Sequence, residues 1–123
     1  MAAAPTSASA PSSSAPAAGT PGAVLVTGTT SGVGLNAVKA LVERGWTVVT
    51  ANRDPVRAAA AATALGIPGE KLHHIRMDLG DLDSVRVGVE TLVGSLGFGL
   101  DALVINAAVY KPRLKQPERS PQG

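Results

Sequence analysis

The run TGTTSGVG at positions 27–34 is the strongest chemical signal in the sequence. Glycines in such a turn let the backbone approach a pyrophosphate, and the N–H groups at a helix N-terminus attract its negative charge. By itself, the spacing G-x-x-x-G-x-G is weak evidence for nucleotide binding. Between a β-branched run and a segment with helical apolar spacing, it favours nucleotide binding over an ordinary tight turn. The candidate contacts are Gly28, Thr30, Ser31, Gly32, Val33 and Gly34.

Asn52 and Arg53 stand at the end of the second predicted strand. NAD-binding sites of this kind place an acid there for the ribose 2′-OH, and an acid would repel a 2′-phosphate. Arg53 can pair with a 2′-phosphate through two N–H donors, and Arg57, one helical turn on, could add a second charge. We therefore predict NADPH as the cofactor; the alternative is that Arg53 is a solvated surface residue. Asp54 is better explained as a helix cap.

Two further segments follow predicted strands. Asp78 and Leu79 come after the third strand, where a carboxylate could accept a hydrogen bond from the adenine amine; a turn residue explains Asp78 equally well. Asn106 and Ala107 close the fourth strand, where small residues let the backbone approach a ligand. The pair His73-His74 has no partner at metal-ligand spacing, and strand alternation puts the two on opposite faces. Both are interpreted as structural, and no metal site is predicted.

An alternation of strands and helices would bring these segments together. Strands are predicted at 23–27, 46–51, 72–77 and 100–106. Helices are predicted at 32–44, at 54–65, and from a cap at Asp81 or Asp83 to Leu96. This pattern predicts an α/β fold with a Rossmann-like, doubly wound parallel sheet. Right-handed crossovers give the strand order 3-2-1-4, the first half of such a sheet.

The chain divides into two predicted parts. Residues 1–22 are rich in Ala, Ser and Pro and carry no charge, so we expect a disordered extension. A plastid transit peptide is the alternative, which the lack of a basic residue before Lys39 disfavours. Residues 23–123 are predicted to be the N-terminal part of an NADP-binding Rossmann domain, truncated, since such sheets normally add further strands. The strand at 100–106 would then be an exposed edge.

Composition excludes several other classes. The chain has no cysteine, so it has no disulfide and no Cys-ligated metal site. No apolar run approaches the roughly 18 residues of a membrane helix. The net charge is +2, but the basic excess lies in residues 111–123, and residues 23–110 are nearly neutral. Because nucleic-acid binding needs a basic face on the folded part, no nucleic-acid partner is predicted.

Taken together, these motifs resemble the short-chain dehydrogenase/reductase family. The shared features are TGTTSGVG, the arginine after the second strand, the Asp78-Leu79 pair and the INAA segment at 105–108. A narrower resemblance, carried by NAAVYKP at 106–112, is to the light-dependent protochlorophyllide oxidoreductases. It covers residues 23–123. Those proteins often have cysteines where this chain has Ile105 and Asn52, so thiol chemistry at these points is not expected.

The resemblance implies NADPH-dependent, light-driven reduction of protochlorophyllide by the full-length parent. The family's catalytic Tyr-x-x-x-Lys is not in this chain, because Leu114 stands four residues after the only tyrosine, Tyr110. No catalytic residue is therefore predicted here. Tyr110 resembles a pigment-side substrate residue, and a loop aromatic is the alternative. Two other functions remain open: a related NADP-dependent reductase of a retinoid- or steroid-like substrate, and a non-catalytic nucleotide-binding module.

The implied partner is a tetrapyrrole pigment, with peripheral attachment to thylakoids left open. The implied location is the cytoplasm of a photosynthetic prokaryote, or a plastid if the N-terminal extension is a transit peptide. Nothing in the residues predicts an oligomeric state.

We predict that residues 1–22 are dispensable for folding, because their composition offers no apolar pattern to bury. Deleting them from the whole protein should leave the thermal midpoint unchanged within error, as measured by calorimetry. A fall of several degrees would show instead that this segment packs on the folded body.

Overall fold

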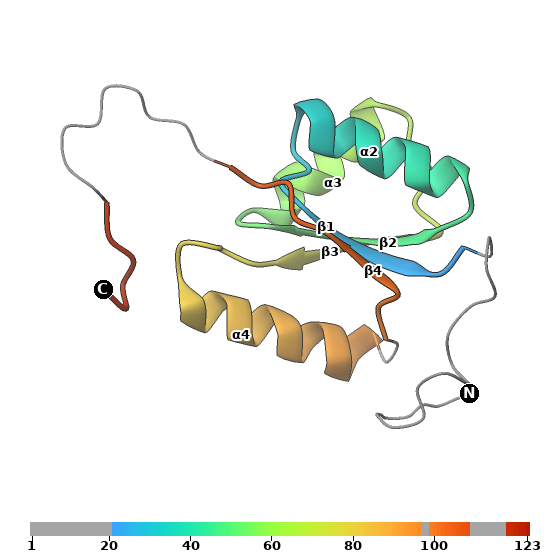
Figure 1. Ribbon diagram of the computed structural model, residues 1–123. Helices are drawn as coiled ribbons and strands as arrows, with labels where there is room; N and C mark the ends of the chain where they lie inside the picture. Colours follow the sequence, from blue (N-terminus) through green and yellow to red (C-terminus); the bar gives the residue numbers. More distant parts are fainter. Residues whose placement is uncertain (1–20, 97–98, 109–117) are drawn as a thin grey trace.

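A four-stranded parallel sheet organises the chain, with helices on both of its faces (Figure 1). The computed structural model describes residues 21–96, 99–108 and 118–123. The strands are β1 (Ala23–Thr27), β2 (Thr47–Asn52), β3 (Leu72–Arg76) and β4 (Ala102–Val104). Helices α2 (Gly32–Glu43) and α3 (Pro55–Ala64) cover one face, and α4 (Leu82–Thr91) covers the other. The order β3-β2-β1-β4 confirms the predicted half of a doubly wound sheet. Most of the predicted disordered extension, residues 1–20, lies outside the described residues.

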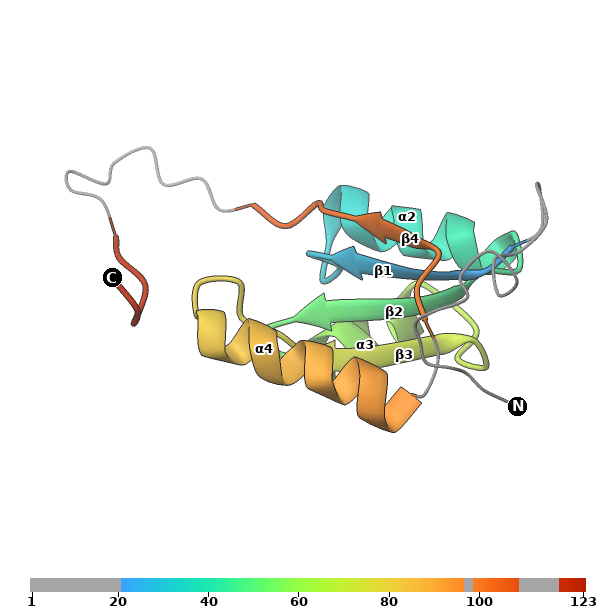
Figure 2. The ribbon, with the colours of Figure 1, turned by 60° about the horizontal axis from the view of Figure 1, so that its bottom comes forward.

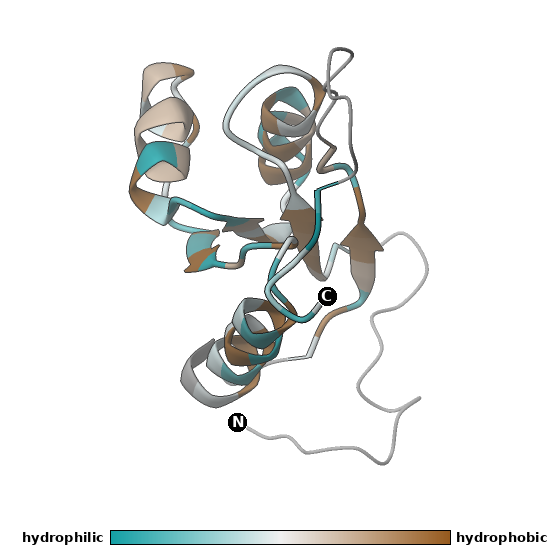
Figure 3. Cartoon of the chain, turned by 90° about the vertical axis from the view of Figure 1, so that its left-hand side faces the viewer, coloured by the Kyte–Doolittle hydropathy of each residue, from teal (hydrophilic) through white to brown (hydrophobic). Residues whose placement is uncertain are grey.

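Strand alternation divides the core into two layers. Val24, Val26 and Val48 face α2 and α3, where they pack with Val38 and Ala62. On the other face, the alternate strand residues pack toward α4: Leu25, Val49, Ala51 and Ile75. Every residue of β1 is buried, as expected for a central parallel strand covered on both sides. Figure 3 shows these apolar strands between helices that also carry hydrophilic residues.

Local capping sets the starts of two helices. The side chain of Asp54 accepts a hydrogen bond from the Arg57 N–H at 3.1 Å, and Pro55 takes the first helical position of α3. This confirms the role predicted for Asp54. Asp81, rather than Asp83, caps α4. That helix is shorter than predicted, because a π-helical segment, η1 (Leu92–Leu96), takes over at its end.

The third and fourth strands are also shorter than predicted. The N–H of Met77 still reaches the Asn52 carbonyl at 2.7 Å, although β3 ends at Arg76. The strand β4 ends at Val104, because the next backbone groups leave the sheet ladder for a side chain of β1. That departure shapes the functional site described below.

The paired histidines of β3 lie on opposite faces, as predicted. His73 is in register with Val49, which packs in the layer facing α4. His74 is in register with Thr50, and its Nδ1 lies 2.6 Å from the threonine hydroxyl. Burial, and then the nearby His73, lower the pKa of His74.

The edge of the sheet at β4 exposes apolar side chains. Figure 2 shows β4 at one border of the sheet, beside β1. Leu103 is 57% exposed and Ile105, just after the strand, is 77% exposed. Among the described residues, β4 pairs with β1 alone. Edge strands of this kind tend to pair with other chains.

We expect the 123-residue chain to self-associate through β4. Replacing both Leu103 and Ile105 by Lys should lower the mass measured by light scattering at high concentration, because a charged edge resists pairing. The matched control is Val56→Lys on α3, a residue 78% exposed and remote from this edge, which should change nothing. A monomeric unmutated chain at every concentration would contradict the expectation.

Candidate functional site

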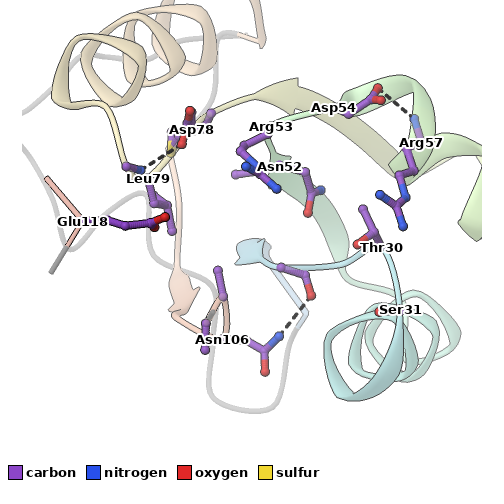
Figure 4. Close-up of a pocket in the computed structure, with 16 residues that line it drawn as sticks. Thr30, Ser31, Asn52, Arg53, Asp54, Arg57, Asp78, Leu79, Asn106 and Glu118 are labelled. Atoms are coloured by element: carbon purple, nitrogen blue, oxygen red, sulfur yellow. Dashed lines mark hydrogen bonds between the residues drawn. The ribbon is translucent and has the colours of Figure 1, made fainter. Parts of the chain in front are cut away.

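A pocket of about 630 Å³ lies at the carboxyl ends of the strands (Figure 4). Its wall comes from the segments that follow β1, β2, β3 and β4, so it depends on all four strands. In parallel α/β sheets, ligands bind at this edge. The lining residues are Gly28, Thr30, Ser31, Ala51, Asn52, Arg53, Asp54, Arg57, Met77, Asp78, Leu79, Gly80, Asn106, Ala107, Ala108 and Glu118.

Most residues predicted from the sequence to contact a cofactor lie at this pocket. These are Gly28, Thr30, Ser31, Arg53, Arg57, Asp78, Leu79, Asn106 and Ala107. The other three, Gly32, Val33 and Gly34, form the first turn of α2 and are not among the lining residues. The Val33 side chain points into solvent and is 78% exposed. Tyr110, the predicted substrate residue, lies outside the described residues.

Two glycines allow the loop between β1 and α2 to fold tightly against the end of β4. Gly28 has a φ of 71°, and a Cβ there would lie 2.7 Å from the Ala107 Cα. A Cβ on Gly34 would collide with the Gly28 carbonyl and lie 2.6 Å from the Asn106 Nδ2. The last glycine of the motif is thus required by packing within the protein, even though it does not line the pocket.

Side chains, rather than strand pairing, hold the end of β4 beside this loop. The Thr27 hydroxyl oxygen accepts hydrogen bonds from the N–H groups of Asn106 and Ala107, both at 3.0 Å. The Asn106 amide donates to the carbonyls of Gly28 at 3.0 Å and Thr27 at 3.3 Å. Asn106 therefore positions the glycine loop. This role of Thr27 has no local sequence signal, because its partner Asn106 lies 79 residues away.

One side of the pocket is positively charged. Arg53 follows β2, Arg57 lies in the first turn of α3, and Figure 4 shows both side chains at this side. Both residues are exposed, and neither forms an ion pair within the described part of the chain. The adjacent Asp54 carboxylate caps α3. Because neither guanidinium group is ion-paired within the described residues, both can bind an anion.

The N-terminus of α2 adds to this anion-binding character. Ser31 occupies the N-cap position but makes no side-chain capping hydrogen bond. The N–H groups of the first turn are therefore not satisfied by that side chain, and they carry the positive end of the helix dipole. A phosphate at this point would meet both donors and favourable charge.

Asp78 has a structural role on the opposite side. Its Oδ1 accepts a hydrogen bond from the Gly80 N–H at 2.9 Å, and its own N–H donates to the Ser84 hydroxyl at 2.8 Å. The turn explanation of Asp78 is therefore confirmed. A contact between its carboxylate and an adenine amine stays a prediction.

Glu118 also lines the pocket, a position that no sequence pattern indicated. The neighbouring Gln122 binds the N-terminal turn of α4. It accepts from the Leu82 N–H at 3.0 Å and donates to the carboxylates of Asp81 at 2.8 Å and Asp83 at 3.2 Å. The hydrogen bond from Gln122 lowers the pKa of Asp81. These contacts hold the segment 118–123 at the edge of the site.

Asn52 and Arg53 stand where NAD-binding sites carry an acid. The side chain of Asn52 is bonded to Thr29, and the residue is only 7% exposed. Asn52 and Arg53 both line the pocket, but only Arg53 of the two is exposed.

The family model for short chain dehydrogenase matches residues 22–121. The chain belongs to this family. Protochlorophyllide reductase A, chloroplastic, from Oryza sativa subsp. japonica is 48% identical to it over 103 residues, which are 83% of this chain and 26% of that protein. The chain thus spans about a quarter of the length of such curated relatives.

Solved structures of the family have the same fold. Menthone neomenthol reductase from Mentha piperita superposes with a TM-score of 0.65 at 32% identity, covering 73% of this chain and 32% of that one. An actinorhodin polyketide ketoreductase solved with NADPH gives a TM-score of 0.62 at 27% identity, covering 72% of this chain and 34% of that one. Within the described residues, no helix is long and apolar enough to cross a membrane.

We predict that Gly34→Ala will destabilise the protein because its Cβ has no room against Gly28 and Asn106. The free energy of unfolding should fall by about 1–3 kcal/mol, the usual cost of overpacking. Gly69→Ala is the matched control, since a Cβ there meets nothing within 4 Å. Urea unfolding would measure both variants, and equal midpoints would refute the packing role of Gly34.

Proposed function

We propose that this chain is the cofactor-binding part of an NADPH-dependent reductase of protochlorophyllide. The assignment of the cofactor rests on one observation: Arg53 and Arg57 lie in one pocket with the N-terminus of α2, where Ser31 makes no side-chain capping hydrogen bond. NADPH is distinguished from NADH by a 2′-phosphate, which is an anion suited to bidentate guanidinium contacts. The related ketoreductase solved with NADPH supports the same cofactor.

Each part of the pocket suits a part of that cofactor. Thr30, Ser31 and the first turn of α2 would hold the pyrophosphate. Arg53 and Arg57 would hold the 2′-phosphate. Leu79, 45% exposed at the pocket, offers an apolar surface to the adenine. The end of β4 at Ala107 would lie alongside the cofactor, where a side chain larger than alanine would obstruct it. The cofactor itself supplies the hydride.

The substrate is proposed from the relatives. Identity of 48% with a protochlorophyllide reductase supports reduction of a double bond in that tetrapyrrole, driven by light that the pigment absorbs. The proton donor would lie in the remainder of the protein. Tyr110 would face the pigment. Because the curated relatives are named as chloroplastic, we also propose a plastid location, which an import assay of the whole protein would test.

The activity is tested with the whole protein, NADPH and protochlorophyllide. Illumination should shift the pigment spectrum to that of chlorophyllide, and a dark sample and a sample with NADH in place of NADPH should react far less. Turnover of a ketone or steroid substrate with no reaction of the pigment would favour a different reductase of this family, such as the menthone neomenthol reductase it resembles.

We predict that Arg53→Asp will weaken NADPH binding by about 1–3 kcal/mol, because a charge-assisted contact to the 2′-phosphate is replaced by repulsion. Binding of NADH should change much less, since it lacks that phosphate. Fluorescence titration of the whole protein gives both dissociation constants. Arg86→Asp on α4, outside the pocket, makes the same change in net charge and should leave both constants unaltered. Equal affinity of the unmutated protein for NADPH and NADH would be incompatible with the assigned role of Arg53.

A further inference from the structure

A pair of hydrogen bonds lies beneath the pocket, between the loop after β1 and the end of β2. The Thr29 N–H donates to the Asn52 Oδ1 at 2.8 Å, and the Asn52 Nδ2 donates to the Thr29 hydroxyl oxygen at 2.8 Å. Thr29 is 1% exposed and Asn52 is 7% exposed. We call these two bonds the Thr29–Asn52 clasp. A single side-chain amide thus satisfies one backbone donor and one hydroxyl in the interior.

The residues that follow Thr29 and Asn52 in the chain are the ones that would hold phosphates. Thr30 and Ser31 follow Thr29 directly and line the pocket, and Arg53 follows Asn52 directly and lines it too. The backbone carbonyl of Asn52 also accepts the Met77 N–H at 2.7 Å. Asn52 therefore connects the glycine loop, β2 and the end of β3 at one point.

The clasp also decides which loop donors can reach a ligand. Because the Thr29 N–H is directed at Asn52, it is not available to a pyrophosphate. A pyrophosphate would therefore be bound by groups further along the loop and in the first turn of α2. The clasp thereby sets where the pyrophosphate subsite begins relative to Arg53.

We propose that Asn52 is a positioning residue for NADPH selectivity: through Thr29, it sets the spacing between the pyrophosphate loop and the guanidinium group of Arg53. This inference rests on the proposed function, because it takes NADPH as the ligand. A cofactor that must contact both subsites depends on their spacing. NADH has no 2′-phosphate for Arg53 to contact and depends on this spacing less.

Dissociation constants of the whole protein for NADPH and NADH test this role without any measurement of turnover. Asn52→Ala should weaken NADPH binding about tenfold, the loss expected when a buried hydrogen-bonded pair is broken. NADH binding should weaken by no more than about twofold, so the NADPH-to-NADH preference falls. Unmutated protein that binds no NADPH would overturn the proposed function and this inference together. Normal binding by the unmutated protein with an unchanged preference in Asn52→Ala would overturn the inference alone.

Substitutions of Thr29 provide a milder test if Asn52→Ala does not fold. Thr29→Ser keeps both hydrogen bonds and should bind NADPH within about twofold of the unmutated protein. Thr29→Val keeps the shape and the backbone bond but removes the hydroxyl, and should lower the NADPH preference. Equal effects of Ser and Val would show that the hydroxyl contact is irrelevant and would refute the clasp.

A double-mutant cycle separates coupling from independent damage. If Thr29 and Asn52 act through each other, the double variant Thr29→Val, Asn52→Ala should bind NADPH no more weakly than Asn52→Ala alone. Effects that simply multiply would mean that the residues act separately, and the proposed spacing role would be wrong.

Discussion

The carboxyl ends of four parallel strands lie at one edge of the sheet. Strand pairing stops there, so side chains must hold the segments that follow the strands together. Thr27 fulfils this requirement for β4, since its hydroxyl accepts both N–H groups that follow the strand. Asn106 completes the link by donating to the glycine loop. These contacts close one side of the pocket, and the close approach they impose is possible only with glycine at Gly28 and Gly34.

Two of the acids that line the pocket have structural roles. Asp54 lies between Arg53 and Arg57 in sequence, and its carboxylate caps α3 by accepting the Arg57 N–H. No ion pair joins it to either guanidinium group among the described residues. Asp78 is similarly held in its own turn.

The strands beneath the pocket and the strand at the edge of the sheet differ in burial. Beneath the pocket, β1 and β2 are buried between helices on both sides. Leu103 in the edge strand β4 and Ile105 just after it are exposed. The segments proposed to bind phosphates thus follow strands that are buried on both faces. The end of β4, which would lie along the cofactor, depends on a few hydrogen bonds to Thr27.

Local sequence alone determined the alternation of strands and helices, the cap at Asp54 and the position of the glycine loop. Each of these depends on neighbours within a few residues, where spacing and turn chemistry act directly. Tertiary structure decided that Val33 points outward, that Asn52 turns inward to Thr29, and that Glu118 reaches the pocket. These outcomes depend on partners 23 or more residues away for Asn52 and about 40 for the segment that carries Glu118. No local pattern encodes such pairings, because they exist only once the strands have been ordered and brought to a common edge.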